Sequence, residues 1–232
     1  MRKYIIFMVL LTGCSINKFT PKVKNITYTP DFDKVTVRGI KITKLHTPFD
    51  LSFRHIDYWD NKPNVKYDTN LIRLNDQTLE FYTKRDTSAC IKSNFIFKYG
   101  KVGALIKFED FPNNFPAFWL MGFNLMPEID IIEYDGNRAW STIHFGYSYE
   151  KGQNKHVGTG EIKGLNPTEY NWYECEVTPY WIKFYVNGQE TAKIKYPLAN
   201  NDSYVQFNSG YTGEVQVDRL SISVKGFYYI KY

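Results

Sequence analysis

The sequence predicts an all-β protein, a sandwich of two antiparallel sheets. Aromatic residues make up 18% of the chain, with 19 Tyr and 17 Phe, and such side chains favour strands over helices. From Val35 onward, short apolar stretches alternate with turn signals, and no segment shows a long apolar period of 3.6 residues. The 232 residues are enough for one large domain with a full core, so we expect a single domain over residues 35–232.

The expected strands are short, and several of them alternate in polarity. Examples are residues 35–37, 79–82, 95–97, 182–186 and 220–224. In residues 101–108, alternation predicts two faces. The face expected in the core between the sheets carries Val102, Ala104, Ile106 and Phe108, and the face expected toward solvent or a groove carries Lys101, Gly103, Leu105 and Lys107. The pair Asn187-Gly188 follows an alternating strand and predicts a type I′ hairpin.

The first residues are typical of an export signal. Basic Arg2 and Lys3 precede an apolar stretch that is too short to span a bilayer, so residues 1–13 are expected to be a signal peptide. The stretch Leu11-Thr12-Gly13-Cys14 resembles the bacterial lipobox, which implies acylation of Cys14 and stable membrane anchoring. The alternative is an ordinary secretory signal with a chance cysteine. We therefore expect an exported bacterial lipoprotein, at the cell surface or in the periplasm, whose residues 14–34 form the lipidated N-terminus and a tether.

Charge and cysteine content limit the partners. Without Arg2 and Lys3, the 29 basic residues fall to 27 against 24 acidic ones, and no basic cluster is present. Nucleic-acid binding is therefore not expected, and we expect a monomer. Cys90 and Cys175 remain in the domain, and the sequence leaves open whether they pair. No set of Cys and His has the spacing of metal ligands.

Three carboxylates fall within the six residues from Glu128 to Glu133, in a strand-like apolar stretch. Strand alternation places Glu128 and Asp130 on one face and Glu133 on the other. One extra residue, a β-bulge at Ile131-Ile132, would return Glu133 to the face of Glu128. Bulges are common beside active sites because they redirect a side chain.

This arrangement suits glycoside hydrolysis with retention, which needs two carboxyl groups ~5–5.5 Å apart. We assign Glu128 as the nucleophile and Glu133 as the general acid/base. Asp130 between them can hydrogen-bond Glu128 and separate the pKa values of the two glutamates. The alternative is a strand with solvent-facing acids that binds a cation.

The chain resembles glycoside hydrolase family 16 over roughly residues 90–225. The motifs that carry the resemblance, in order, span residues 93–102, 115–121, 128–133, 142–146, 170–177 and 182–188. The Glu-x-Asp-x-x-Glu form matches the bulged branch of laminarinases, agarases and carrageenases. The resemblance implies a concanavalin-like β-jelly-roll with a concave substrate cleft, retention, and the catalytic roles given above. Where many members carry Glu and Arg, this chain has Gly103 and Leu105, which leaves the substrate contacts of that face undecided.

Aromatic and polar residues near the acids are candidates for substrate binding. Trp119 shares a face with Ala117 and Met121, and its indole could stack on a sugar, although a core tryptophan is the alternative. Trp140 and His144 also share a face, and His144 could donate to a sugar hydroxyl, bond an active-site acid or be structural. The remaining candidates are Trp59 and Asn208, whereas Trp172 and Trp181 are expected to pack in the core or on the surface.

The sequence as a whole predicts a retaining endo-β-glycanase that hydrolyses a β-1,3- or β-1,4-linked polysaccharide, with β-glucan favoured over galactan. No cofactor is required, because the two carboxylates supply the chemistry. Asp218 matches a family aspartate that holds a structural calcium ion, although one carboxylate is not a complete site. The alternatives are a transglycosylase on the same fold and a non-catalytic glycan-binding lipoprotein.

Overall fold

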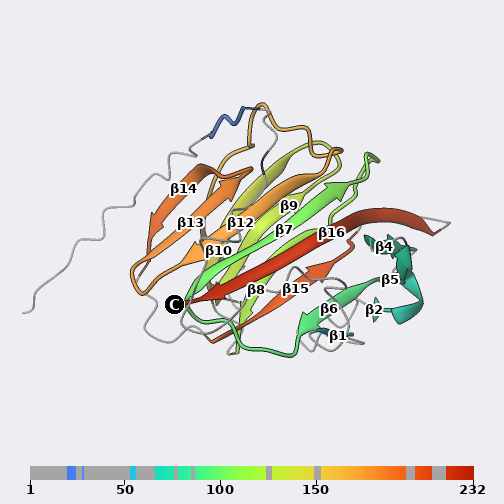
Figure 1. The fold of residues 1–232 in the computed structure, drawn as a ribbon, viewed down its shortest axis with the longest axis horizontal. Coiled ribbons are helices and arrows are strands. Elements are labelled where there is room, and N and C mark those ends of the chain that lie inside the picture. Colours follow the sequence, from blue (N-terminus) through green and yellow to red (C-terminus); the bar gives the residue numbers. More distant parts are fainter. Residues whose placement is uncertain are drawn as a thin grey trace, which may run out of the picture.

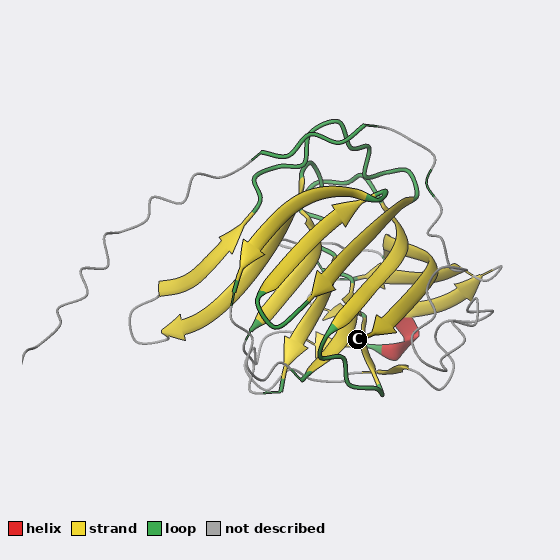
Figure 2. Ribbon diagram, turned by 60° about the vertical axis from the view of Figure 1, so that its left-hand side comes forward, coloured by secondary structure: helices red, strands yellow, loops and turns green. Residues whose placement is uncertain are grey.

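The computed structural model is a sandwich of two antiparallel sheets, which lie one over the other in Figure 1 and are coloured as strands in Figure 2. The structure describes residues 20–24, 28, 53–55, 66–75, 78–84, 87–123, 127–148, 153–196, 202–210 and 218–232. One turn of 3-10 helix, η1 (Thr69–Leu71), is the only helix in these ranges. The predicted all-β jelly-roll class is confirmed.

Each main sheet has seven strands. The first, which we call the site sheet, has the spatial order β1 (Phe53–His55), β6 (Cys90–Ser93), β15 (Ser203–Asn208), β8 (Ala117–Gly122), β9 (Glu128–Tyr134), β10 (Ala139–Ser148) and β11 (Gln153–Gly158). The second, which we call the opposite sheet, has the order β14 (Gln189–Lys195), β13 (Trp181–Val186), β12 (Asn171–Val177), β7 (Gly100–Phe108), β16 (Arg219–Lys231), β4 (Thr78–Thr83) and β3 (Ile72–Asn75). The short strands β2 (Lys66–Tyr67) and β5 (Thr87–Ser88) form a separate parallel pair.

The core lies between the inner faces of the two sheets. In β7 the inward set predicted from alternation is fully buried, which confirms that face: Val102, Ala104, Ile106 and Phe108 are each 0% exposed. Phe118 of the site sheet stacks on Phe207 beside it, with ring centroids 4.5 Å apart and nearly parallel planes. Burial of such aromatic surface is the main source of stability for a sandwich of this kind.

The other face of β7 was predicted to point toward solvent or a groove, and of these two alternatives the groove is wrong. β7 lies in the middle of the opposite sheet, so its second face points away from the molecule on the side remote from β9. Gly103 packs there under Tyr228, whose ring would lie 2.6 Å from any Cβ at that position. Leu105 packs against a small cluster that includes Trp172. The two residues that replace the family's Glu and Arg therefore contribute to packing on this outer face.

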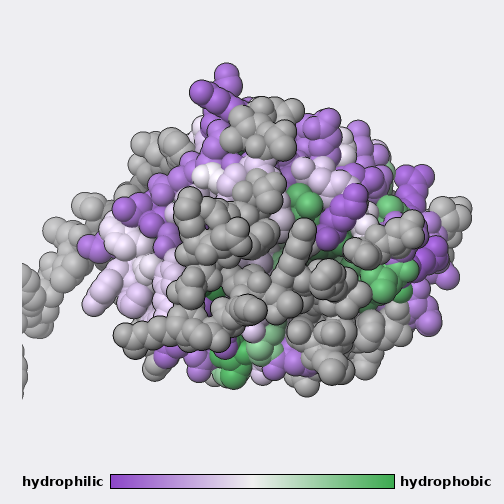
Figure 3. All heavy atoms as spheres, viewed as in Figure 1, coloured by the Kyte–Doolittle hydropathy of each residue, from purple (hydrophilic) through white to green (hydrophobic). Residues whose placement is uncertain are grey.

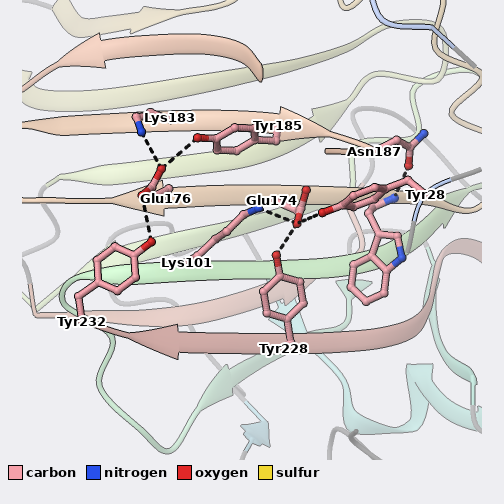
Figure 4. A network of polar contacts seen from close by, with 10 residues as sticks. Tyr28, Lys101, Glu174, Glu176, Lys183, Tyr185, Asn187, Tyr228 and Tyr232 are labelled. Carbon is pink, nitrogen blue, oxygen red and sulfur yellow. Dashed lines mark hydrogen bonds and ion pairs between the residues drawn. The ribbon is translucent and has the colours of Figure 1, made fainter. Parts of the chain in front are cut away.

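A buried carboxylate organises the outer face of the opposite sheet, as Figure 4 shows. Glu174 of β12 is fully buried, and its Oε1 receives Lys101 Nζ at 3.0 Å and the hydroxyls of Tyr28 and Tyr228. Desolvation, followed by the charge of Glu174, raises the pKa of Tyr228. The network joins β7, β12 and β16 to Tyr28, a residue outside the predicted domain.

Part of the predicted tether lies against the sandwich. The Val23 amide donates to the Lys163 carbonyl at 2.9 Å, and the Val23 side chain is 4% exposed within the main core cluster. The Gln189 side chain makes two hydrogen bonds with the backbone of Lys24: it accepts from the amide at 3.0 Å and donates to the carbonyl at 2.8 Å. The first nineteen residues, including Cys14, lie outside the described part of the chain. In the described residues we find no helix whose length and apolar content would let it cross a bilayer.

Other predictions for the fold are settled by local geometry. Asn187 and Gly188 both have positive φ, at 49° and 72°, between β13 and β14, as a type I′ turn requires. Cys90 and Cys175 are both buried and unpaired, and they belong to different sheets. Figure 3 shows mostly hydrophilic described residues on the visible face, with hydrophobic ones in separate places rather than in one patch.

Candidate active site

The outer face of the site sheet brings together most of the residues predicted for catalysis. The three acids lie on β9, which is paired with β8 on one side and β10 on the other. Residues directly opposite each other on neighbouring strands share a face. The pairs on this face are Trp119 with Asp130, Met121 with Glu128, Trp140 with Glu133, Thr142 with Asp130 and His144 with Glu128.

An extra residue in β9 produces this grouping. Ile132 and Asp130 pair with consecutive residues of β8, so the register between β9 and β8 shifts by one residue at this point. The register between β9 and β10 shifts over the same stretch. Ile131 is therefore the additional residue, and the predicted β-bulge at Ile131 and Ile132 is confirmed. The bulge returns Glu133 to the face of Glu128, while both isoleucines stay buried in the core.

Ser141, on the neighbouring strand β10, stabilises the bulge. Its side chain is 1% exposed, and its hydroxyl donates to the Ile131 carbonyl at 2.8 Å. The Ser141 amide in turn donates to Thr159 Oγ1 at 2.9 Å. A bulge residue has no partner in the ladder, so a side-chain donor is the natural partner for its carbonyl.

Glu133 has the environment of a carboxylic acid that keeps its proton at neutral pH. Burial, and then the nearby charge of Asp130, raise the pKa of Glu133 from the ordinary 4.5 to about 8. Hydrogen bonds from Trp140 and Thr142 and the charge of His144 act in the opposite direction, and they do not cancel the rise. The Trp140 Nε1–H donates to Glu133 Oε2 at 2.8 Å.

Asp130 is buried between the two glutamates and is held by His144. The His144 Nε2 lies 3.0 Å from Asp130 Oδ2, and the Asp130 side chain is only 4% exposed. One ligand atom from each of Glu128, Asp130 and His144 lies within 4.8 Å of the others, which is close enough to hold a metal ion. Of the three roles weighed for His144, the structure shows the contact with one of the predicted acids, Asp130; a contact with a sugar hydroxyl stays a prediction.

Trp119 and Asn208 lie on the same face, toward β15. The Trp119 Nε1–H donates to Asn208 Oδ1 at 2.7 Å, and Trp119 packs with Ala117 and Met121 in a small cluster outside the main core. Trp119 is thus on the predicted side of the sheet, although its ring is 3% exposed. Its stacking on a sugar stays a prediction, as does the part of Asn208 in the cleft.

The other predicted site residues lie elsewhere. Trp59 falls outside the described residues. Asp218 stands just before β16, where Arg73 and Lys84 each approach its carboxylate at 3.8 Å. Calcium at Asp218 stays a prediction. Trp172 and Trp181 belong to the opposite sheet and pack there, as expected.

A pocket of about 470 Å³ lies at the β10–β11 end of the site sheet, a size common for ligand sites. Its lining comprises Thr20, Arg138, Trp140, Thr142, His156, Gly158, Thr159, Gly160 and Glu161. Trp140 and Thr142 are also the two side chains that hydrogen-bond Glu133. Trp140 and Thr142 therefore contact both the pocket and Glu133, the acid with the raised pKa.

Sequence reasoning missed two residues that shape the site. Ser141 had a usable signal, because it is a polar residue at a core-facing position opposite the bulge. Tyr67 had none, because it lies where the family motifs match only loosely. Burial, then Cys90 and Glu128, raise the pKa of the Tyr67 phenol, which places its ring near the Glu128 end of the site.

Two curated proteins are similar to this chain in sequence. A keratan-sulfate endo-1,4-beta-galactosidase of Sphingobacterium multivorum is 33% identical over 105 residues, which is 40% of this chain and 24% of that protein. The clotting factor G alpha subunit of Tachypleus tridentatus is 27% identical over 121 residues, or 47% of this chain and 17% of that protein. The chain therefore spans about a quarter or less of the length of these relatives.

Solved structures share the fold at low sequence identity. A Bacteroides ovatus mixed linkage glucan family 16 protein, in complex with a product, gives a TM-score of 0.65 at 18% identity and covers 78% of this chain and 96% of its own. The laminarinase catalytic domain of Thermotoga maritima gives 0.64 at 18% identity, covering 78% and 92%. A lichenase from a mouse hindgut metagenome gives 0.66 at 15% identity, covering 82% and 98%.

A family description also matches this chain. It extends over residues 59–217, more than half of the chain, and includes all three acids of β9 and the strands on either side of them. The described fold, the bulge and the grouping of the acids agree with the match. The chain belongs to the family described as glycosyl hydrolases family 16.

Proposed function

We propose that this protein is a retaining endo-β-glycanase, with Glu128 as nucleophile and Glu133 as general acid/base. The observation that carries the proposal is the raised pKa of Glu133, which lies on the same strand face as Glu128. Glu133 is partly buried, and its pKa is raised to about 8, so it holds a proton at neutral pH. A pair of carboxyl groups with separated pKa values is what a glycosidase needs to divide the acid role from the nucleophile role.

In the first step, a Glu128 oxygen attacks the anomeric carbon as the bond from that carbon to the glycosidic oxygen breaks. Glu133 gives its proton to the departing oxygen, and the reducing-side fragment leaves. The sugar that remains is bound covalently to Glu128, with its anomeric configuration inverted.

In the second step, Glu133 is a carboxylate and acts as a base. It takes a proton from a water molecule whose oxygen attacks the same anomeric carbon, and Glu128 leaves. The second inversion restores the original configuration, and Glu133 is protonated again. Burial, and then the charge of Asp130, which His144 contacts, keep the pKa of Glu133 high while the site is empty.

The proposed substrate is a β-1,3- or β-1,4-linked polysaccharide, with β-glucan favoured and galactan as the alternative. Support for glucan comes from the fold neighbours, which are described as acting on mixed linkage glucan or laminarin. Support for galactan comes from the sequence relative described as a keratan-sulfate endo-1,4-beta-galactosidase. We also propose that the protein is exported and anchored through Cys14, on the strength of the lipobox-like stretch.

The test is a reducing-end assay with laminarin, lichenan, agarose, carrageenan, xyloglucan and keratan sulfate. We expect cleavage of at least one polymer, with retention of configuration seen by proton NMR of the first product formed. Glu128→Gln should abolish turnover and leave polysaccharide binding intact. Glu190→Gln, at an exposed position of β14, is the matched control and should behave as the unaltered protein.

Each other outcome points to a different function. Binding without cleavage across the panel would make the protein a glycan-binding lipoprotein. Transfer to an added acceptor sugar in preference to water would make it a transglycosylase. Cleavage that survives in Glu128→Gln would refute the assignment of the nucleophile.

A further inference from the structure

Trp140 hydrogen-bonds Glu133 and also lines the neighbouring pocket. It stands directly opposite Glu133 on the neighbouring strand, and its indole N–H donates to Glu133 Oε2 at 2.8 Å. The same side chain lines the pocket of about 470 Å³ at the β10–β11 end of the sheet. One rigid side chain therefore touches both the acid and the space beside it.

The hydrogen bond determines which oxygen of Glu133 can carry the acidic proton. An indole N–H is a donor only, so the oxygen that faces it must accept. Oε2 therefore accepts the hydrogen bond from Trp140, and in the protonated acid Oε1 carries the hydrogen. Thr142, the other side chain bonded to Glu133, has a hydroxyl that can donate or accept and so tolerates either state.

The indole is itself held in place. The Phe115 ring lies 6.1 Å from the Trp140 ring, and the Arg138 guanidinium lies 5.9 Å from the ring centroid. Arg138 is fixed in turn by Asp135, which accepts from Arg138 Nε at 3.0 Å and from NH2 at 2.6 Å. A donor held in this way can fix the rotation of the Glu133 carboxyl.

The oxygen that Glu133 protonates belongs to the departing sugar, so that sugar must lie beside Glu133. The pocket lies next to Trp140 and Thr142, the two side chains that hydrogen-bond Glu133, and it can receive that sugar. We propose that Trp140 is a positioning residue, which presents Oε1 of Glu133 to the glycosidic oxygen and forms with its ring the wall against which the departing sugar binds. The inference rests on the proposed function.

The key variant is Trp140→Phe, which keeps an aromatic wall and removes the donor. We expect kcat on the polysaccharide to fall by about ten- to a hundredfold with KM little changed, because only proton transfer is impaired. Dinitrophenolate leaves without protonation, so the burst from dinitrophenyl β-laminaribioside should stay within about twofold of the unaltered protein. Trp140→Ala also removes the wall and should raise KM.

The pH profile supplies a readout that a merely structural residue would not change. The Trp140 hydrogen bond lowers the pKa of Glu133, so its removal should move the alkaline limb of kcat/KM to higher pH even as the rate falls. Trp181→Phe, on the opposite sheet, is the matched control and should alter neither the rate nor the limb.

A measurement on the unaltered protein covers the case in which Trp140→Phe fails to fold. Of the five tryptophans, one indole N–H resonance should titrate with a midpoint near pH 8, and that titration should vanish in Glu133→Gln. The absence of any such titration would overturn the inference.

Glu133→Gln also separates the inference from the function. If Glu133→Gln loses polysaccharide hydrolysis and keeps the dinitrophenolate burst, the acid role stands. A Trp140→Phe variant that then matches the unaltered protein in rate and pH profile would overturn the role of Trp140 alone. If Glu133→Gln hydrolyses polysaccharide normally, both proposals are refuted.

Discussion

Replacing Ser141 with alanine should loosen the bulge that places Glu133. The change removes the hydroxyl that donates to the Ile131 carbonyl at 2.8 Å and leaves that carbonyl buried without this partner. An unsatisfied buried acceptor costs about 1–3 kcal/mol. For a domain of this size, 1 kcal/mol corresponds to about 2–4 °C in Tm, so the expected loss is about 2–12 °C.

The consequence for activity should be larger than the loss of stability implies. A shift of about 1 Å in a reacting group can cost about a hundredfold in rate, and a full slip of register would send Glu133 to the core face. We therefore expect a fall of about ten- to a hundredfold in kcat/KM on the best polysaccharide, measured well below Tm.

Ser221→Ala is the matched control for this prediction. Ser221 is equally buried and loses a comparable hydrogen bond, at 2.6 Å to Asn114 Oδ1, but it lies in the opposite sheet. Its Tm should fall by a similar amount, with kcat/KM unchanged. Equal losses of Tm in both variants, with full activity in Ser141→Ala, would refute the idea that this bond shapes the site.

Four further predictions concern charge. The kcat/KM of the unaltered protein should fall as pH rises through about 8, where Glu133 of the free protein loses its proton; an alkaline limb below pH 6 would contradict the assignment. The pKa of Glu133 is higher in the folded state than in the unfolded chain, so its ionisation destabilises the fold progressively between pH 4.5 and about 8. The Tm of Glu133→Gln should therefore rise relative to that of the unaltered protein over this pH range. A difference in Tm that does not change with pH would count against this prediction. Asp130→Asn removes a charge that raises the pKa of Glu133, so the alkaline limb should move to lower pH in a rate profile. Glu174→Gln should cost about 1.5–3 kcal/mol by denaturant unfolding without changing kcat, since it weakens the Lys101 contact far from the site.

The bulge was predictable because two requirements conflicted. Alternation placed Glu128 and Glu133 on opposite faces, and the chemistry needed them on one face, so an extra residue had to lie between them. The inward face of β7 was predictable for a simpler reason, since four apolar residues at every second position can be buried together only between sheets.

The position of β7 was not predictable in the same way. Alternation indicates which residues share a face, but it carries no information about which of the two sheets a strand joins. Gly103 and Leu105 were therefore placed in a groove when they pack under Tyr228 and against Trp172. The partners of Glu174 come from strands far apart in sequence, and no spacing rule connects them.

Residues 20–24 are attached to the sandwich, which would limit the distance between the protein and a membrane if the proposed lipid anchor is present. Thr20 lines the pocket next to Trp140, and Val23 is fixed in the core. If Cys14 carries the lipid, as proposed, only the five residues 15–19 lie between it and Thr20 at this rim, and the six steps from Cys14 to Thr20 reach at most ~22 Å. Such an enzyme would cut glycan chains brought to the lipid surface, and lengthening the stretch between Cys14 and Thr20 would widen the zone that it serves.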